Sequence, residues 1–139
     1  MNLKKKFKVY LAVPIINFYN FELTKILGKI INDIGYELSS PWVLSGKDKD
    51  LSPSEIFERD TSHVKDSDIL IAEVSKPSHG VGMEIMLAYL EGKRIILLAK
   101  KDVKLSALLE GIKDAVIIRY EDEEELLEKL RKELGEMCK

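Results

Sequence analysis

Apolar residues follow two different periods along this chain, and the alternation of these periods predicts strands separated by helices. Short apolar runs rich in β-branched residues are typical of strands buried on both faces of a parallel sheet. Such runs cover residues 7–13, 36–40, 69–72, 94–98 and 115–119. Between them, apolar residues recur at the spacing of one helix face, over residues 21–34, 53–67, 83–90, 105–112 and a final stretch after Asp122.

Residues that favour helix ends support these boundaries. Ser52, Pro53 and Glu55 combine an N-cap serine, a proline at the first helical position and the glutamate of a capping box. Gly35 and Gly92 follow the last apolar residues of two helices, at the position where glycine commonly ends a helix.

Strands that alternate with helices predict a three-layer, doubly wound α/β domain with a five-stranded parallel sheet. We expect residues 1–139 to form this single domain, with the strand order 2-1-3-4-5. In that order, ligands bind at the carboxyl edge of the sheet, in the crevice between the first and third strands.

The segment 74–82 leaves the third strand at this edge and is expected to be a loop. Its Gly80 and Gly82 would let another group approach the backbone closely. The third glycine of the dinucleotide-binding fingerprint is missing. Glu84 is expected in the first turn of the next helix, where an acid either serves the site or only complements the helix dipole.

Asp60 and Tyr10 are two further candidates for the crevice. Asp60 lies among apolar helix neighbours, so it either lines a cavity or shares a solvated face with Glu58 and Arg59. Tyr10 lies on the first strand. Two carboxylates facing each other, with a tyrosine to orient one of them, would suit the chemistry of glycosidic bonds.

Composition narrows the class of protein. The net charge of −2 gives no electrostatic footprint for nucleic acid or an anionic membrane, and no apolar run approaches the length of a membrane span. One cysteine, Cys138, excludes an internal disulfide and is typical of the reducing cytoplasm. His63 and His79 lack metal-ligand spacing and are expected at the surface, so no metal and no cofactor is expected.

Three motifs resemble the nucleoside 2-deoxyribosyltransferase superfamily, and most closely its 2′-deoxynucleoside 5′-phosphate N-hydrolase branch. They are ERD at residues 58–60, DSDILIAEVS at 66–75 and PSHGVGME at 77–84. The resemblance implies that Glu84 engages the anomeric carbon of the sugar and that Asp60 handles the proton at the base. It also implies that Tyr10 hydrogen-bonds the glutamate.

The same resemblance implies how a 5′-phosphate would be bound. Ser78 matches a phosphate-binding serine of the family, and it precedes a helix N-terminus, which favours anions in any protein. Ser106 matches a serine that serves the neighbouring subunit's site, which implies a homodimer.

Two departures put the substrate in question more than the reaction. Residues 13–17 replace the branch's Gly-Ser-Ile-Arg-Gly phosphate loop, so Asn17 or a lysine would have to substitute for the arginine. Trp42 stands where the branch tends to have a histidine. We therefore expect hydrolysis of a (deoxy)nucleoside 5′-monophosphate at its N-glycosidic bond. A base-exchanging deoxyribosyltransferase and a non-catalytic nucleotide-binding domain remain the alternatives.

Overall fold

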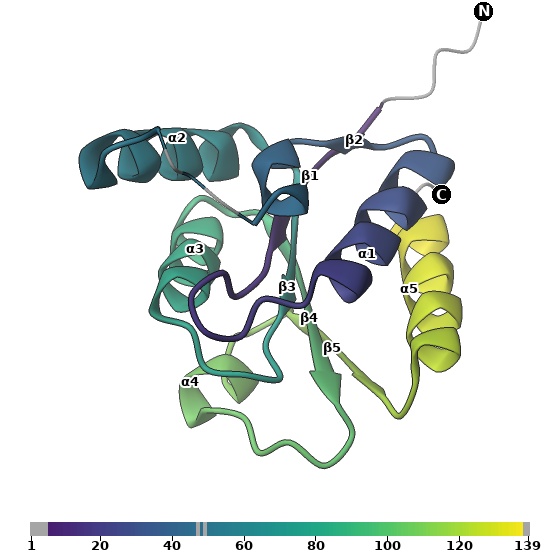
Figure 1. Cartoon of the computed structure of the whole chain (residues 1–139). Coiled ribbons are helices and arrows are strands. Elements are labelled where there is room, and N and C mark those ends of the chain that lie inside the picture. Colours follow the sequence, from purple (N-terminus) through teal and green to yellow (C-terminus); the bar gives the residue numbers. More distant parts are fainter. Residues whose placement is uncertain (1–5, 47, 49, 138–139) are drawn as a thin grey trace, which may run out of the picture.

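The computed structural model describes residues 6–46, 48 and 50–137, and it contains a five-stranded parallel sheet of order β2-β1-β3-β4-β5 (Figure 1). This order and the α/β class confirm the predictions from the sequence. The strands are β1 (Lys8–Ala12), β2 (Glu37–Leu38), β3 (Ile69–Glu73), β4 (Arg94–Lys100) and β5 (Val116–Tyr120).

Helices cover both faces of the sheet, which gives the expected three layers. The helices are α1 (Phe21–Asp33), the 3₁₀ helix η1 (Pro41–Leu44), α2 (Pro53–Asp66), α3 (His79–Leu90), α4 (Ala107–Glu110) and α5 (Glu123–Met137). One buried cluster joins the sheet to α1 and α5. A second joins the opposite face to α2, α3 and the segment around α4.

Alternate residues of β1 face these two clusters, because successive side chains of a strand point to opposite faces. Val9 and Leu11 belong to the α1 side, whereas Tyr10 and Ala12 belong to the α2–α3 side. The tyrosine of β1 therefore points toward the same layer as the helices that carry Asp60 and Glu84.

The α2 helix begins as its sequence predicted. The Ser52 side chain accepts a hydrogen bond from the Glu55 backbone N–H at 3.2 Å, and the Glu55 carboxylate accepts one from the Ser52 N–H at 3.0 Å. This capping box fixes the first turn, and thereby the direction in which the later residues of α2 point.

The α3 helix begins earlier than predicted. Residues 74–82 were expected to form a loop, but α3 starts at His79, and Ser78 caps it by accepting a hydrogen bond from the Val81 N–H at 3.3 Å. Glycine lowers helix propensity, which is why Gly80 and Gly82 pointed to a loop. Glu84 consequently lies in the second turn, beyond the first turn where the helix dipole favours an acid.

Candidate active site

Tyr10 and Glu84 form a hydrogen bond between the centre of the sheet and α3. The Tyr10 hydroxyl donates to Glu84 Oε2, and the two residues are 74 positions apart in the sequence. Tyr10 is 1% exposed, so its ring is held by the core and its hydroxyl has little freedom. The hydrogen bond therefore holds the Glu84 carboxyl group in place between the sheet and α2.

The surroundings of this pair favour the protonated forms of the Glu84 carboxyl group and the Tyr10 hydroxyl. Burial raises the pKa of Glu84 to about 7, and the charge of Asp60 adds to this, while the Tyr10 hydrogen bond and Arg59 oppose it. Burial and the charge of Glu84 raise the pKa of Tyr10 far above its ordinary value. Tyr10 therefore remains a hydrogen-bond donor, and Glu84 exchanges between its neutral and ionised forms near neutral pH.

Asp60 lies on α2 with its side chain 24% exposed, and its Oδ1 accepts a hydrogen bond from Arg59 Nε at 2.8 Å. Burial raises the pKa of Asp60, while the hydrogen bond and charge of Arg59 oppose that rise. Of the two interpretations left open by the sequence, a solvated helix face does not describe this residue. Asp60 is a partly buried carboxyl group electrostatically coupled to Glu84.

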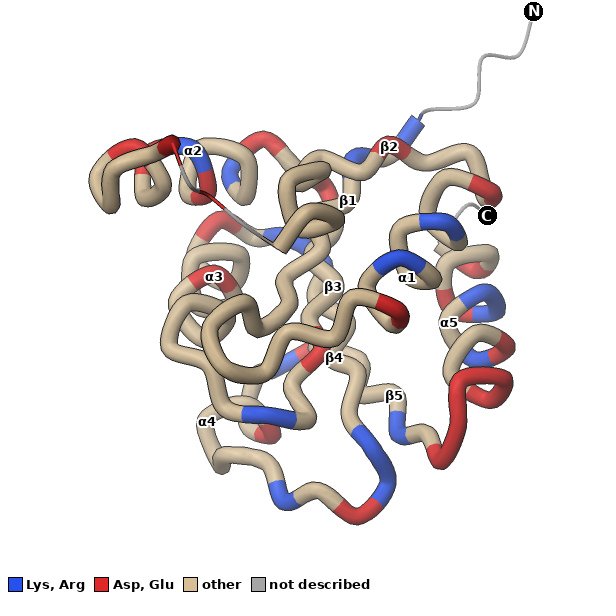
Figure 2. Tube along the Cα trace, in the orientation of Figure 1, with Lys and Arg blue, Asp and Glu red and all other residues tan. Residues whose placement is uncertain are grey.

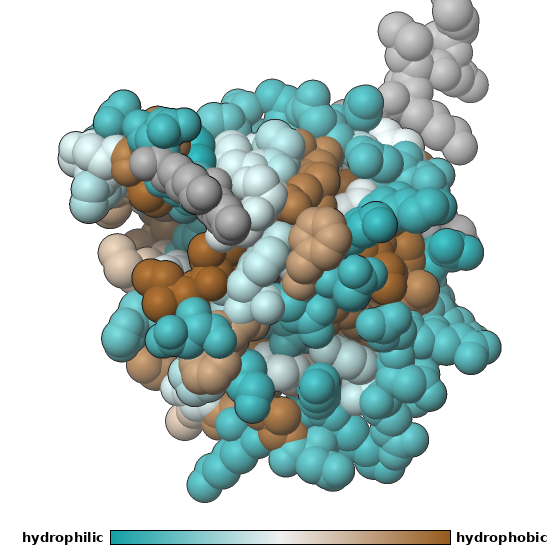
Figure 3. Space-filling view, in the orientation of Figure 1, coloured by the Kyte–Doolittle hydropathy of each residue, from teal (hydrophilic) through white to brown (hydrophobic). Residues whose placement is uncertain are grey.

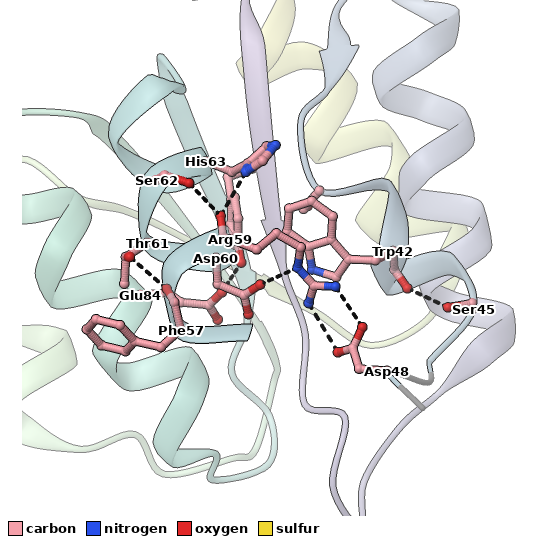
Figure 4. Close-up of polar contacts among 12 residues, drawn as sticks. Trp42, Ser45, Asp48, Phe57, Arg59, Asp60, Thr61, Ser62, His63 and Glu84 are labelled. Carbon is pink, nitrogen blue, oxygen red and sulfur yellow. Dashed lines mark hydrogen bonds and ion pairs between the residues drawn. The ribbon is translucent and has the colours of Figure 1, made fainter. Parts of the chain in front are cut away.

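Arg59 and Trp42, which the sequence did not single out as site residues, complete the cluster (Figure 4). The Arg59 guanidinium lies 4.0 Å from the Trp42 ring centroid, and it donates two hydrogen bonds to Asp48, at 2.7 and 3.1 Å. The Trp42 ring also contacts Tyr10 edge-on, with centroids 6.1 Å apart. Aromatic and cationic contacts thus connect the Asp60 side of the cluster to the Tyr10 side.

His63, which was expected at the surface, is half-buried and takes part in this cluster. Its ring packs edge-on against Trp42, with centroids 4.8 Å apart, and its Nδ1 lies 2.7 Å from the Arg59 carbonyl oxygen. His63 lies four residues after Arg59 on α2, so it supports the same side of Trp42 as the guanidinium.

Gly80 and Gly82 lie on α3 close to Glu84, and both are exposed. A Cβ atom added to either glycine would meet no other atom within 4 Å. Neither a strained backbone nor packing inside the chain therefore requires glycine here. The two residues leave open space beside the first turns of α3, which is consistent with their expected role in ligand approach.

Asn17 and Ser106 lie apart from the Tyr10–Glu84 pair. Asn17 lies in the segment between β1 and α1, with a φ of 70°, and lines a cleft of about 440 Å³ together with Lys76 and Lys100. Ser106 is the N-cap of α4, and its Oγ accepts a hydrogen bond from the Leu108 N–H at 3.2 Å.

A second buried carboxylate lies in the wall of that cleft. Glu73, at the end of β3, is 7% exposed and accepts hydrogen bonds from the Tyr120 hydroxyl at 2.5 Å and the Ser75 N–H at 2.6 Å. These contacts tie the ends of β3 and β5 together and give Glu73 a structural role.

Among the described residues there is no group of three or more His, Cys, Asp or Glu side chains that could hold a metal ion. Within the same part of the chain, no helix is long and apolar enough to cross a membrane.

Comparisons with known proteins identify relatives of this chain. A protein of Thermofilum pendens named "Putative 2'-deoxynucleoside 5'-phosphate N-hydrolase 1" is 36% identical over 88% of this chain and 92% of its own length. The 5-hydroxymethyl-dUMP N-hydrolase of Danio rerio is 35% identical over 58% of this chain and 57% of its own length. Among solved structures, the Clostridium botulinum CMP N-glycosidase BcmB superposes with a TM-score of 0.72 and 28% identity, covering 88% of this chain and 97% of its own.

The family model for nucleoside 2-deoxyribosyltransferases matches residues 9–134, nearly the whole described chain. That match spans the sheet, the Tyr10–Glu84 pair and α2. The chain therefore belongs to the nucleoside 2-deoxyribosyltransferase family.

Proposed function

We propose that the protein hydrolyses the N-glycosidic bond of nucleoside 5′-monophosphates, releasing the free base and a (deoxy)ribose 5-phosphate. The observation that carries this proposal is the half-buried Glu84 carboxyl group, held by the Tyr10 hydroxyl and electrostatically coupled to Asp60. Two carboxyl groups of unequal surroundings are what cleavage through an oxocarbenium-like transition state requires. The names of the N-hydrolase and N-glycosidase relatives support the same reaction class.

In this mechanism Glu84 acts in its ionised form. Its carboxylate faces the anomeric carbon and stabilises the positive charge that develops as the bond to the base breaks. Asp60 delivers a proton to the departing base, and water supplies the new hydroxyl on the anomeric carbon while its released proton returns to the Asp60 carboxylate. Tyr10, which stays protonated, donates its hydrogen bond to Glu84 throughout and keeps the carboxylate from turning away.

The phosphate would bind at the N-terminal end of α3. Ser78 and the exposed first-turn N–H groups of α3 favour an anion there. The loop between β1 and α1 carries no charged residue, whereas lysines follow β3 and β4 (Figure 2). Lys76 lies 5.8 Å from the ring centroid of Phe18, in that uncharged loop. We therefore propose Lys76, together with Asn17, as the substitute for the family's arginine.

We also propose that the protein acts as a homodimer. The helix α3 buries Val81, Ile85 and Ala88 against the sheet, yet its outer face is apolar as well. A helix that is apolar on all sides is usually covered on all sides, and exposed apolar patches of this kind mark interfaces. The exposed apolar residues on α2, α3 and α4 are Phe57, Met83, Met86, Tyr89, Leu90 and Leu108.

A shared site is testable by mixing variants. If Ser106 serves the partner's site, inactive Glu84→Ala and damaged Ser106→Ala proteins should regain part of the activity when their subunits are exchanged. A mixture no more active than its components, under conditions where exchange is demonstrated, would contradict the shared site.

The main test measures base release from a panel of ribo- and deoxyribonucleosides and their 5′-monophosphates, with and without a second free base. We expect release from monophosphates in water, and almost complete loss of release in Glu84→Gln. Formation of a new nucleoside when a second base is present would identify a transferase instead. No release from any substrate, or a parental rate in Glu84→Gln, would refute the proposed mechanism.

A further inference from the structure

We propose that Arg59 is a positioning residue: clamped between Trp42 and Asp48, it holds the Asp60 carboxyl group in the orientation that serves the leaving base. The inference deepens the proposed function, because it concerns how the proton donor of that reaction is held. Nothing in it requires Arg59 to touch the substrate.

The contact between Arg59 and Asp60 is unusual for a helix. Side chains of consecutive residues diverge by about 100° around the helix axis, so they do not normally face each other. Here Arg59 Nε nevertheless lies 2.8 Å from Asp60 Oδ1. Other contacts of the guanidinium hold it on the side of Asp60.

Trp42 and Asp48 supply these contacts. The ring of Trp42 supports the flat face of the guanidinium at 4.0 Å, and the Asp48 carboxylate accepts from both terminal nitrogens. This two-point contact uses the planar fork of arginine, which lysine lacks. All three charged side chains are 18–24% exposed, so the network is only partly screened by water and has a well-defined geometry.

The charged groups around Asp60 indicate that Arg59 has a larger effect than an isolated ion pair at the surface would have. The groups that act on Asp60 are Arg59 and His63 on its own helix and Asp48 from the segment before α2. Glu84 on α3 and Tyr10 on β1 both sense the charge of Asp60. Arg59 is the cation in direct hydrogen-bond contact with Asp60, so it both orients this carboxyl group and balances its charge against Glu84.

The first experiment is a double-mutant cycle on kcat/KM for 5′-monophosphates with good and poor leaving bases. Arg59→Lys should reduce kcat/KM roughly tenfold to a hundredfold, the usual scale for one charge-assisted hydrogen bond, and most for poor leaving bases. In an Asp60→Asn background the same change should add less than about twofold, because coupled residues are not additive. Losses that multiply would show that Arg59 acts independently of Asp60 and would overturn the proposal.

The second experiment does not depend on activity. Trp42 is the one tryptophan of the chain, so its emission spectrum reports directly on the clamp. Arg59→Lys and Asp48→Asn should both change this emission, whereas Arg131→Lys, an exposed arginine on α5, should not. Unchanged emission in both clamp variants would refute the clamp even if the enzyme is active. A changed emission in a protein that cleaves no nucleotide would support the clamp and refute the proposed function.

The Asp48→Asn variant keeps the test decisive if Arg59→Lys is poorly folded. Asp48 lies outside the helices and strands, and its replacement leaves the Arg59–Asp60 hydrogen bond available. We expect an intermediate loss of kcat/KM and an acid limb of the pH profile that remains close to that of the parent. In Arg59→Gln, which removes the positive charge that Arg59→Lys retains, that limb should move to higher pH, because the charge of Arg59 lowers the pKa of Glu84. An unmoved limb in folded Arg59→Gln would contradict the proposed electrostatic coupling.

Discussion

Glu84→Gln should make the protein more stable at alkaline pH while abolishing its activity. Burial raises the pKa of Glu84 from an ordinary 4.5 to about 7, so the folded protein retains this proton at a pH where the unfolded chain has lost it. Folding is then destabilised as the pH rises from 4.5 to 7, because the folded state binds more protons than the unfolded state. Glutamine never ionises and still offers Tyr10 an acceptor oxygen, so the variant avoids this penalty.

The size of the effect follows from the two pKa values. The difference between 4.5 and about 7 corresponds to about 3 kcal/mol of unfolding free energy, at about 1.4 kcal/mol for each pKa unit. For a domain of 139 residues this is an increase in Tm of about 10 °C at pH 8. Below pH 4.5 the pH-dependent part of the difference should vanish, because both states of the parent carry the proton.

The assay is urea denaturation of the parent and Glu84→Gln at several pH values from 4 to 8.5. The informative quantity is the difference in unfolding free energy between the two proteins, since constant contributions from packing cancel in its pH dependence. The difference should rise between about pH 4.5 and 7 and level off above that range. Asp60→Asn is the matched control, because it removes the carboxyl group that is electrostatically coupled to Glu84. A difference that stays flat across this range would refute the assignment of Glu84 as a buried, proton-retaining group.

Three further predictions concern the reaction and the assembly. Asp60→Asn should lower kcat/KM most for substrates whose base is a poor leaving group; an equal loss for good and poor leaving bases would argue against proton transfer by Asp60. Lys76→Gln should lower kcat/KM for a monophosphate about tenfold and leave the nucleoside unaffected, whereas Lys113→Gln, in the turn before β5 at the opposite edge of the sheet, should change neither. Met86→Glu should shift sedimentation from dimer to monomer without lowering Tm by more than a few degrees; an unchanged sedimentation coefficient would show that α3 is not the interface.

The fold was predictable because the central strands β1, β3 and β4 are buried on both faces, and such strands read as continuous apolar runs. The start of α3 was not predictable, since Gly80 and Gly82 oppose a helix in local propensity and are tolerated only in the folded context. A Cβ atom added at either glycine would meet nothing within 4 Å, and their expected role in ligand approach stays a prediction. The local sequence pattern therefore predicted the strands and helices of the fold more accurately than the exact start of α3 near Glu84.

The site itself was only partly predictable. Within an apolar strand, Tyr10 is indistinguishable from an ordinary core residue, so its pairing with Glu84 followed from family resemblance and not from spacing. The clamp was missed because Trp42, Asp48 and Arg59 come from different segments, and a side-chain contact between positions 59 and 60 contradicts helix geometry. The signals that pointed to this region were the ERD motif, which contains Arg59, and Trp42 at a position where the related branch tends to have a histidine.

The residues on the two sides of the sheet's carboxyl edge are held with different firmness. This difference affects whether the reaction class or the nucleotide preference can change more easily. Tyr10, Glu84 and Asp60 are held by the core, by helices and by the Arg59 clamp, so altering one of them disturbs several contacts. The loop between β1 and α1 is different: it carries no charged residue, and its exposed Phe18 lines a cleft whose lysines, Lys76 and Lys100, lie on other segments. Apolar side chains reach the surface on this face of the molecule (Figure 3). A lysine binds phosphate as a point charge without fixed geometry, so it can take over from an arginine without rearranging the Tyr10–Glu84 pair. Reaction class should therefore be retained among relatives of this chain more strictly than preference for a particular nucleotide.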